Sequence, residues 1–152
     1  MDHEELVENW VERQPDHQLA ITEAPVSVES AQSNKSVDIV IIEDYDPPLE
    51  KINRSAIESA SSLNPQKTDR MEAVLAHAPD PLHVRVFEAK AGQITFKAIG
   101  QSLSYSELLP DCYGDTRSIE VIEKGIIYLE SDPFIEKAAE ALGISLHQFS
   151  FD

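Results

Sequence analysis

Residues 37–42 form the densest run of apolar, β-branched residues in the chain, interrupted only by Asp38. A short run of this kind is typical of a strand that is buried on both faces. The acidic and proline-containing stretch 43–48 follows it directly and has the composition of a turn. We therefore expect residues 37–43 to be the central strand of a sheet, with the neighbouring segments packed on each side.

Four other stretches have the apolar spacing of amphipathic helices. Residues 3–13 place an apolar stripe opposite a row of glutamates, the stripe being Leu6, Val7, Trp10 and Val11. Residues 49–63 and 66–78 predict two further helices, which end at the prolines that follow them. Two helices of this length between strands would also allow a crossover to a parallel neighbour.

The fourth predicted helix begins after Asp132, a favoured N-cap residue, with Pro133 at its first position and Gly143 as its stop. Its expected inner face is Phe134, Ile135, Ala138, Ala139 and Leu142. Residues 134–145 also resemble the first helix and turn of a helix-turn-helix motif, but few residues remain for a recognition helix and none of them is basic.

Alternating apolar and polar residues predict several more strands. Residues 18–22 are a short strand, and 23–36 are either an edge strand followed by a loop or one long mobile connection. Residues 82–99 are expected to form a hairpin around a turn at 89–93, followed by a loop at 100–117 with one helical turn near 105–109. Residues 118–130 form a second hairpin or a helix and a strand, and 144–152 dock as a last strand or turn. The fold class is α+β: residues 1–152 as one domain, with a mixed or antiparallel sheet of about five or six strands and helices packed on it.

Charge limits the functions that the chain can have. It contains 28 acidic against 12 basic residues, a formal net charge of −16, and 13 acids against 2 bases fall within residues 1–50. Such a field repels phosphate backbones and anionic membranes and attracts basic surfaces. We therefore expect no direct nucleic-acid binding, no membrane association and a basic protein partner, although acidity also serves solubility alone.

Cys112 is the single cysteine, so no intramolecular disulfide forms. No apolar run reaches the length of a membrane span, and the acidic first residues differ from a signal peptide. The expected location is the cytoplasm. The oligomeric state is left open.

The cluster Glu43, Asp44 and Asp46 is the first candidate for chemistry, because acids beyond the carboxyl end of a strand can hold Mg²⁺. No suitably placed lysine or glycine-rich loop accompanies it, and five glycines in the whole chain argue against a phosphate cradle. The five histidines show no metal-ligand spacing. We therefore expect neither a metal nor another cofactor, and a solvated turn rather than a metal site at the acidic cluster.

The second candidate is Glu88-Ala89-Lys90, preceded by Pro79-Asp80, which resembles the acidic and E-x-K pattern of restriction-type nucleases. Asp80 and Glu88 lie at opposite ends of one predicted strand, about 26 Å apart at ~3.3 Å per residue, so they cannot share a metal. Asp38 or Asp44 would have to supply the partner from a neighbouring strand. This geometry and the net charge argue against a nuclease.

The sequence therefore favours a non-enzymatic, acidic protein that occludes a basic protein partner, as an inhibitor, an immunity protein or a DNA mimic does. The expected contacts are the acids of the first helix and the acidic turn with its tyrosine: Glu4, Glu5, Glu8, Glu12, Glu43, Asp44, Tyr45 and Asp46. The alternative is a structural or assembly subunit that associates through the apolar tail with Phe149 and Phe151. A small metal-dependent enzyme that uses Glu43, Asp44 and Asp46 is the third interpretation.

Overall fold

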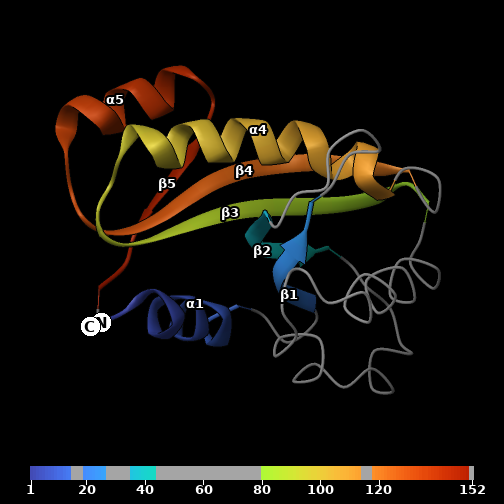
Figure 1. Cartoon of the computed structure of the whole chain (residues 1–152), viewed down its shortest axis with the longest axis horizontal. Coiled ribbons are helices and arrows are strands. Elements are labelled where there is room, and N and C mark those ends of the chain that lie inside the picture. Colours follow the sequence, from blue (N-terminus) through green and yellow to red (C-terminus); the bar gives the residue numbers. More distant parts are fainter. Residues whose placement is uncertain (15–18, 27–34, 44–79, 114–117, 151–152) are drawn as a thin grey trace.

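The computed structural model describes residues 1–14, 19–26, 35–43, 80–113 and 118–150. These residues form a five-stranded mixed sheet with three helices (Figure 1), which confirms the α+β fold class. The elements are α1 (His3–Glu12), β1 (Leu19–Pro25), β2 (Ser36–Ile42), β3 (Leu82–Gln93), α4 (Phe96–Tyr113), β4 (Ile119–Glu130), α5 (Pro133–Ala141) and β5 (Ser145–Gln148). No helix in these ranges is long and apolar enough to cross a membrane.

The strands follow one another across the sheet in chain order. β1, β2 and β3 are antiparallel neighbours, whereas β3, β4 and β5 run parallel. β3 is therefore the middle strand and joins an antiparallel half to a parallel half. β2, which we expected at the centre, is the second strand, and its pairing with β3 is antiparallel rather than the parallel crossover considered above. The two helices predicted at 49–63 and 66–78 lie outside the described residues.

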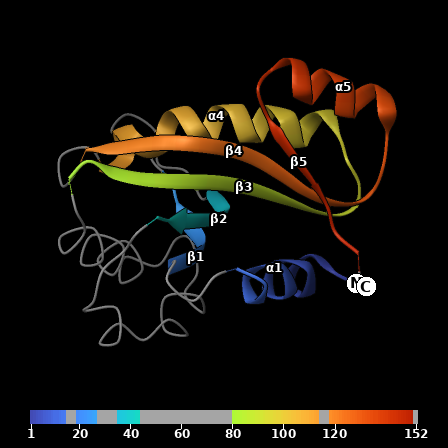
Figure 2. The ribbon, with the colours of Figure 1, turned by 180° about the vertical axis from the view of Figure 1, so that it is seen from behind.

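Helices cover both faces of the sheet, with α1 on one face and α4 and α5 on the other (Figures 1 and 2). The α1 face buries the predicted stripe of Leu6, Val7, Trp10 and Val11 against strand residues that include Ile39 and Phe87. On the opposite face, Tyr105 and Leu109 of α4 pack on residues of β1, β2 and β3. β2 is thus buried on both sides, as its apolar run predicts.

The helix predicted at residues 3–13 is confirmed as α1. Asp2 caps it: the Glu5 N–H donates to Asp2 Oδ1 at 2.8 Å, and Glu5 Oε2 accepts from the Asp2 N–H at 3.2 Å. This reciprocal pair is a capping box, which satisfies two backbone donors at the start of the helix. The sequence pattern and the local hydrogen bonds therefore favour the same element.

The hairpin predicted for residues 82–99 is wrong. β3 continues through the expected turn, with Gly92 inside the strand, and residues from Phe96 onward begin α4. Residues 100–113, which belong to the loop predicted at 100–117, are part of α4. The Ala98 N–H donates to Thr95 Oγ1 at 3.2 Å, so Thr95 serves as a helix cap. The buried positions Ser102 and Ser106 interrupt the apolar stripe of this helix and hide its period in the sequence.

Both interpretations of residues 118–130 are wrong as well, because the whole segment from Ile119 to Glu130 is the single strand β4. Gly125 does not make a turn. A Cβ at this position would lie 2.6 Å from Ser145 Oγ and 2.7 Å from the ring of Phe87. The glycine therefore leaves room for the side chains of two neighbouring strands.

Replacing Gly125 by alanine is expected to destabilise the fold by about 1–3 kcal/mol, because the buried Phe87 ring has to shift. Urea denaturation followed by circular dichroism measures the loss. Gly100→Ala is the matched control: nothing lies within 4 Å of its added Cβ, and its place inside α4 predicts a gain of about 0.5–1 kcal/mol. Equal stability of G125A and the wild type would contradict the packing described here.

The helix and the last strand predicted after Asp132 are confirmed, but the inner face of the helix differs from the prediction. Asp132 Oδ1 accepts from the Phe134 and Ile135 N–H groups and caps α5, and Gly143 follows it with a φ of 76°. β5 then occupies Ser145–Gln148, so no second helix of a helix-turn-helix follows. Two residues of the expected inner face, Phe134 and Leu142, are instead 75% and 48% exposed.

Candidate functional site

Asp38 lies where the pairing of β2 with both of its neighbours is interrupted. Towards β1, Thr22 pairs with Ile39 and Ala24 pairs with Val37, but the intervening Glu23–Asp38 pair is absent. Glu23 has a φ of 51°, a left-handed conformation that costs a non-glycine residue about 1–3 kcal/mol. The local backbone is thus distorted next to Asp38.

On the other side, the ladder between β2 and β3 ends at Ile39 and Phe87. The same register would place Asp38 opposite Glu88. In place of a further ladder bond, the Ala89 N–H donates to Asp38 Oδ2 at 2.8 Å. The side chain of Asp38 therefore occupies the space between the two strands as they separate.

Glu88 brings a second carboxyl group to the same point. Its side chain is 2% exposed and hydrogen-bonds to Asp38, while Oε1 has no partner within the described residues. A buried polar atom without a partner costs free energy and is uncommon in native proteins. Two facing carboxyl groups, one of which has an unused oxygen, form a concentrated oxygen-donor site.

The proximity of the two groups sets their protonation. Burial, together with the charge of Asp38, raises the pKa of Glu88 to about 10, so Glu88 is protonated at neutral pH. Burial alone would raise the pKa of Asp38, but hydrogen bonds from His3, Glu88 and the Ala89 N–H hold it below its ordinary value. The pair therefore carries one negative charge, as expected for carboxyl groups that share a site.

Two basic side chains border the acid pair. His3 of α1 lies with Nε2 3.3 Å from Asp38 Oδ2, and this hydrogen bond raises the pKa of His3, with burial opposing it. Lys90, two residues after Glu88 on β3, is close enough for its charge to lower the pKa of both Glu88 and His3. An acid pair with an adjacent lysine can hold a cation and stabilise a developing negative charge.

α4 closes the other side of Glu88, which follows the buried residues Val84 and Val86 along the same face of β3. Burial and the nearby Glu88 raise the pKa of Tyr105, to whose hydroxyl Gln101 is hydrogen-bonded. The hydroxyls of Ser102 and Ser106 are buried and have no partner in the described structure. The buried side of α4 therefore carries a tyrosine near Glu88 and two buried serine hydroxyls.

The arrangement suits a small, hard cation. Mg²⁺ prefers oxygen ligands and is held by one or two carboxylates, waters and substrate phosphates rather than by a complete protein cage. The described residues contain no cluster of three histidine, cysteine or acidic side chains that could hold a metal ion. An Mg²⁺ ion at the Asp38–Glu88 pair would therefore have only two carboxyl ligands from the described residues, and Glu88 would lose its proton on binding.

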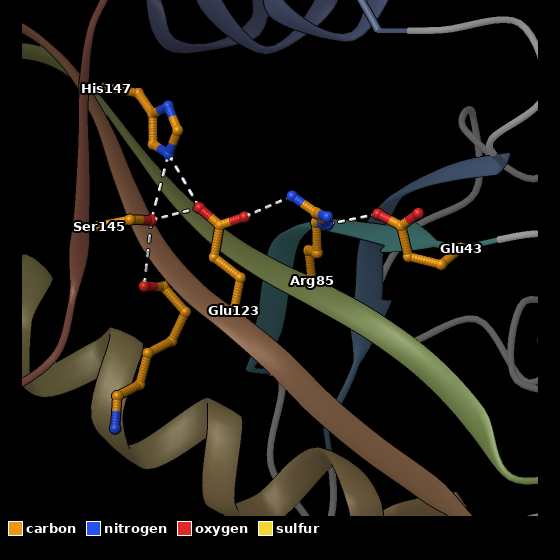
Figure 3. A network of polar contacts seen from close by, with 6 residues as sticks. Glu43, Arg85, Glu123, Ser145 and His147 are labelled. Atoms are coloured by element: carbon orange, nitrogen blue, oxygen red, sulfur yellow. Dashed lines mark hydrogen bonds and ion pairs between the residues drawn. The ribbon is translucent and has the colours of Figure 1, made fainter.

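A second polar network crosses the sheet on the α1 side and links β3, β4 and β5 to Glu43, the residue that follows β2 (Figure 3). Arg85 forms an ion pair with Glu43 and donates from Nη1 to Glu123 Oε1 at 2.9 Å. Glu123 Oε2 accepts from Ser145 Oγ at 2.5 Å, and His147 Nε2 lies 3.1 Å from both of these atoms. In a catalytic triad the serine and the carboxylate contact different nitrogens of the histidine ring. Here both contact Nε2, so the network is a structural one.

The Glu123 network predicts a pH-dependent stability. Burial opposes ionisation of Glu123, but bonds from Ser145 and His147 and the nearby charges hold its pKa below the ordinary value of 4.5. A lowered folded-state pKa stabilises the fold above the unfolded pKa, and this contribution is lost as the pH falls through the folded pKa.

We therefore expect Glu123→Gln to lower the free energy of unfolding at pH 7 and to differ less from the wild type as the pH falls below 4.5. Urea unfolding at a series of pH values measures this difference. Glu120→Gln, which changes a largely exposed carboxylate on the same strand, is the control. A difference between E123Q and the wild type that grows on acidification contradicts the prediction.

The residues predicted to bind a partner fall into three groups. Glu4, Glu5, Glu8 and Glu12 are all exposed on α1, and Glu5 also belongs to the capping box. Glu43 is partly buried and bound to Arg85. Asp44, Tyr45 and Asp46 lie outside the described residues, so the predicted acidic turn has no structural description beyond Glu43.

The structure brings together residues that the sequence could pair only in principle. Asp80, which we expected at the other end of the same strand from Glu88, lies just before β3, and Asp38 supplies the second carboxyl group from the neighbouring strand. His3 was not predicted to take part. The available signal was Asp38 itself, a single charge inside an otherwise apolar strand. Scans of the chain against protein families, curated proteins and solved structures found no match.

Proposed function

We propose that this protein is a metal-dependent phosphodiesterase of the nuclease type, with its centre at Asp38, Glu88 and Lys90. The observation that carries the proposal is the buried Glu88 carboxyl, which faces Asp38 and leaves Oε1 unpartnered. Structural carboxyl groups normally satisfy their oxygens, whereas sites for hard cations keep oxygens available. The E-x-K pattern that resembles restriction-type nucleases adds a second, sequence-based support.

Each residue then has a chemical role. Asp38 and Glu88 would hold the cation through their carboxyl oxygens, with Glu88 losing its proton when the cation binds. The cation would supply Lewis-acid activation of the phosphoryl group and of a water molecule. The ammonium group of Lys90, whose charge lowers the pKa of Glu88, would stabilise negative charge that develops on the phosphodiester. His3 holds Asp38 in place from α1.

The net charge of −16 opposes the approach of a polyanion, and this was the reason to expect no direct contact with nucleic acid. The repulsion acts over long distances at low salt, but the Debye screening length is only about 3 Å in 1 M salt. A metal site needs only a local contact with one phosphate. We therefore expect the rate of nucleic-acid hydrolysis to rise with ionic strength, whereas that of most nucleases falls.

The test uses the purified wild-type chain with bis(p-nitrophenyl) phosphate and with single-stranded and double-stranded oligonucleotides. Release of nitrophenolate and of shortened oligonucleotides is measured with Mg²⁺, with Mn²⁺ and with a chelator, at 0.1 M and 1 M KCl. We expect hydrolysis with either metal and none with the chelator. Absence of hydrolysis under all metal conditions, together with an unchanged thermal midpoint on metal addition, rejects the proposal.

A second candidate is the acidic protein that occludes a basic partner. The supporting observation is that Glu4, Glu8 and Glu12 are exposed and follow one another at intervals of four residues, so they share a face of α1. Glu43 contributes less to such a surface because Arg85 neutralises it. Binding to a basic protein should weaken strongly between 0.05 M and 0.5 M salt and on the triple change E4K/E8K/E12K.

The assembly interpretation has less support, since Phe149 is buried and Phe151 lies outside the described residues.

A further inference from the structure

The acid pair is almost completely enclosed, and Asp38 is its more exposed member. Glu88 is 2% exposed, whereas the side chain of Asp38 is 18% exposed. On the α4 side, the buried ring of Tyr105 packs in one cluster with Val84 and Val86, which precede Glu88 on the same face of β3. We therefore expect a cation to reach the pair from Asp38, on the side where this residue contacts α1.

α1 covers that approach (Figures 1 and 2). Its apolar stripe packs on Ile39 and Phe87, which are the neighbours of Asp38 and Glu88 in the chain. His3 is the first residue of the helix and lies over Asp38, with Nε2 3.3 Å from Oδ2. The capping box fixes the start of α1 and therefore the position from which His3 reaches the acid pair.

The contacts of Asp38 differ in how easily a cation can replace them. Oδ2 accepts the Ala89 N–H at 2.8 Å and also contacts His3, so both acceptor positions of this oxygen are used. The Ala89 N–H belongs to the backbone of β3 and cannot turn away. The side chain of His3 is 51% exposed, so water can replace Asp38 as its partner at low cost. The contact with His3 is therefore the one that a cation at Oδ2 would displace.

We propose that His3 makes an autoinhibitory contact: it occupies Asp38 in the metal-free protein, and a divalent cation binds the acid pair in competition with it. This inference rests on the metal-dependent phosphodiesterase proposed above and names the regulation of its site. Release of His3 frees Oδ2 and opens the approach from the α1 side. The rest of α1 stays in place, because Trp10 packs on Phe87 with ring centroids 4.6 Å apart.

The test compares Mn²⁺ binding by the wild-type chain and two variants at pH 7.5, with the free ion measured by electron paramagnetic resonance. His3→Ala removes the contact, whereas His3→Gln keeps a side-chain N–H that can donate to Asp38. We expect H3A to lower the Kd at least about threefold, since the cation no longer has to break a hydrogen bond to a charged group. H3Q should lie between H3A and the wild type.

His83→Ala is the matched control. His83 contacts Glu120 at 3.2 Å and its side chain is 46% exposed, so this pair resembles that of His3 and Asp38 but lies at the other end of β3 from Glu88. H83A should keep the wild-type Kd. In nuclear magnetic resonance spectra of the wild type, Mg²⁺ should shift the imidazole signals of His3 and leave those of His83 unchanged.

Three results would overturn the autoinhibitory contact. H3A and H3Q could bind Mn²⁺ no more tightly than the wild type, in which case His3 does not compete with the cation. H83A could gain as much affinity as H3A, so that the effect is not local to Asp38. Saturating Mg²⁺ could leave the His3 signals unmoved, which would show that the cation binds without displacing this side chain.

The two proposals fail separately. Tighter Mn²⁺ binding by H3A, combined with no hydrolysis of bis(p-nitrophenyl) phosphate by the wild type, rejects the phosphodiesterase alone. Metal-dependent hydrolysis by the wild type, combined with an unchanged or raised Kd in H3A, rejects the autoinhibitory contact alone. Both are rejected if neither the wild type nor H3A binds Mn²⁺.

Discussion

Replacing Asp38 by asparagine is expected to lower metal-dependent phosphodiester hydrolysis by about 10³-fold or more while leaving the protein folded. Asparagine keeps the size of the side chain and an oxygen that accepts the Ala89 N–H. It removes the negative charge that the cation requires, and a bound cation is worth several kcal/mol of transition-state stabilisation. The initial rate of bis(p-nitrophenyl) phosphate hydrolysis at saturating Mg²⁺ measures the effect.

Asp111→Asn is the matched control, because it makes the same substitution at an exposed position of α4 and should keep the wild-type rate. Circular dichroism checks that both variants fold. Glu88→Gln adds an independent test, since the neutral amide replaces a carboxyl that is already protonated in the metal-free protein. E88Q should therefore fold normally and yet lose activity. A D38N or E88Q protein with wild-type activity would exclude the acid pair as the catalytic centre.

Replacing Trp10 by alanine is expected to lower the free energy of unfolding by about 3–5 kcal/mol. Trp10 is 8% exposed, its ring lies 4.6 Å from that of Phe87 between centroids, and His147 packs against it edge to face at 6.1 Å. Its removal leaves a cavity between α1 and the sheet that these aromatic neighbours cannot fill. Urea denaturation followed by circular dichroism measures the loss, because Trp10 is the single tryptophan and its fluorescence disappears with it.

Ile122→Ala, which truncates a side chain that is 47% exposed, should cost less than about 1 kcal/mol in the same measurement. A loss as small for W10A would show that α1 contributes little to the fold. The expected loss of stability also affects the candidate site, because α1 positions His3 against Asp38. Partial loosening of α1 should therefore change metal binding before the sheet unfolds.

The sequence predicts the elements whose local signals and packing agree. α1 and α5 have both an apolar stripe and a capping residue, and both are confirmed. α4 fails because its signals conflict: the segment around Phe96 alternates like a strand, Pro110 lies inside the helix, and buried serines interrupt the stripe. β4 fails because Gly125 is typical of a turn when only the local sequence is considered. Its reason for being glycine is Phe87, 38 residues away in the chain.

The same limit applies to the candidate site. The E-x-K pattern identifies Glu88 and Lys90, but the position of the second carboxyl group depends on which strand pairs with β3 and in which register. A long segment separates β2 from β3 in the sequence, so no local rule fixes their register. Asp38 becomes the partner only because Ile39 pairs with Phe87.

The acid pair in turn constrains how β2 and β3 align. If β2 slipped by one residue, Val37 or Ile39 would lie opposite Glu88, and every β2 side chain would change faces. The buried carboxyl of Glu88 would then lose its hydrogen bond to Asp38 and face a hydrocarbon side chain. An apolar ladder of isoleucines and valines distinguishes poorly between such alignments, because its members are nearly interchangeable. The Asp38–Glu88 pair thus selects one alignment of the sheet, so the residues proposed for catalysis also specify the fold that holds them.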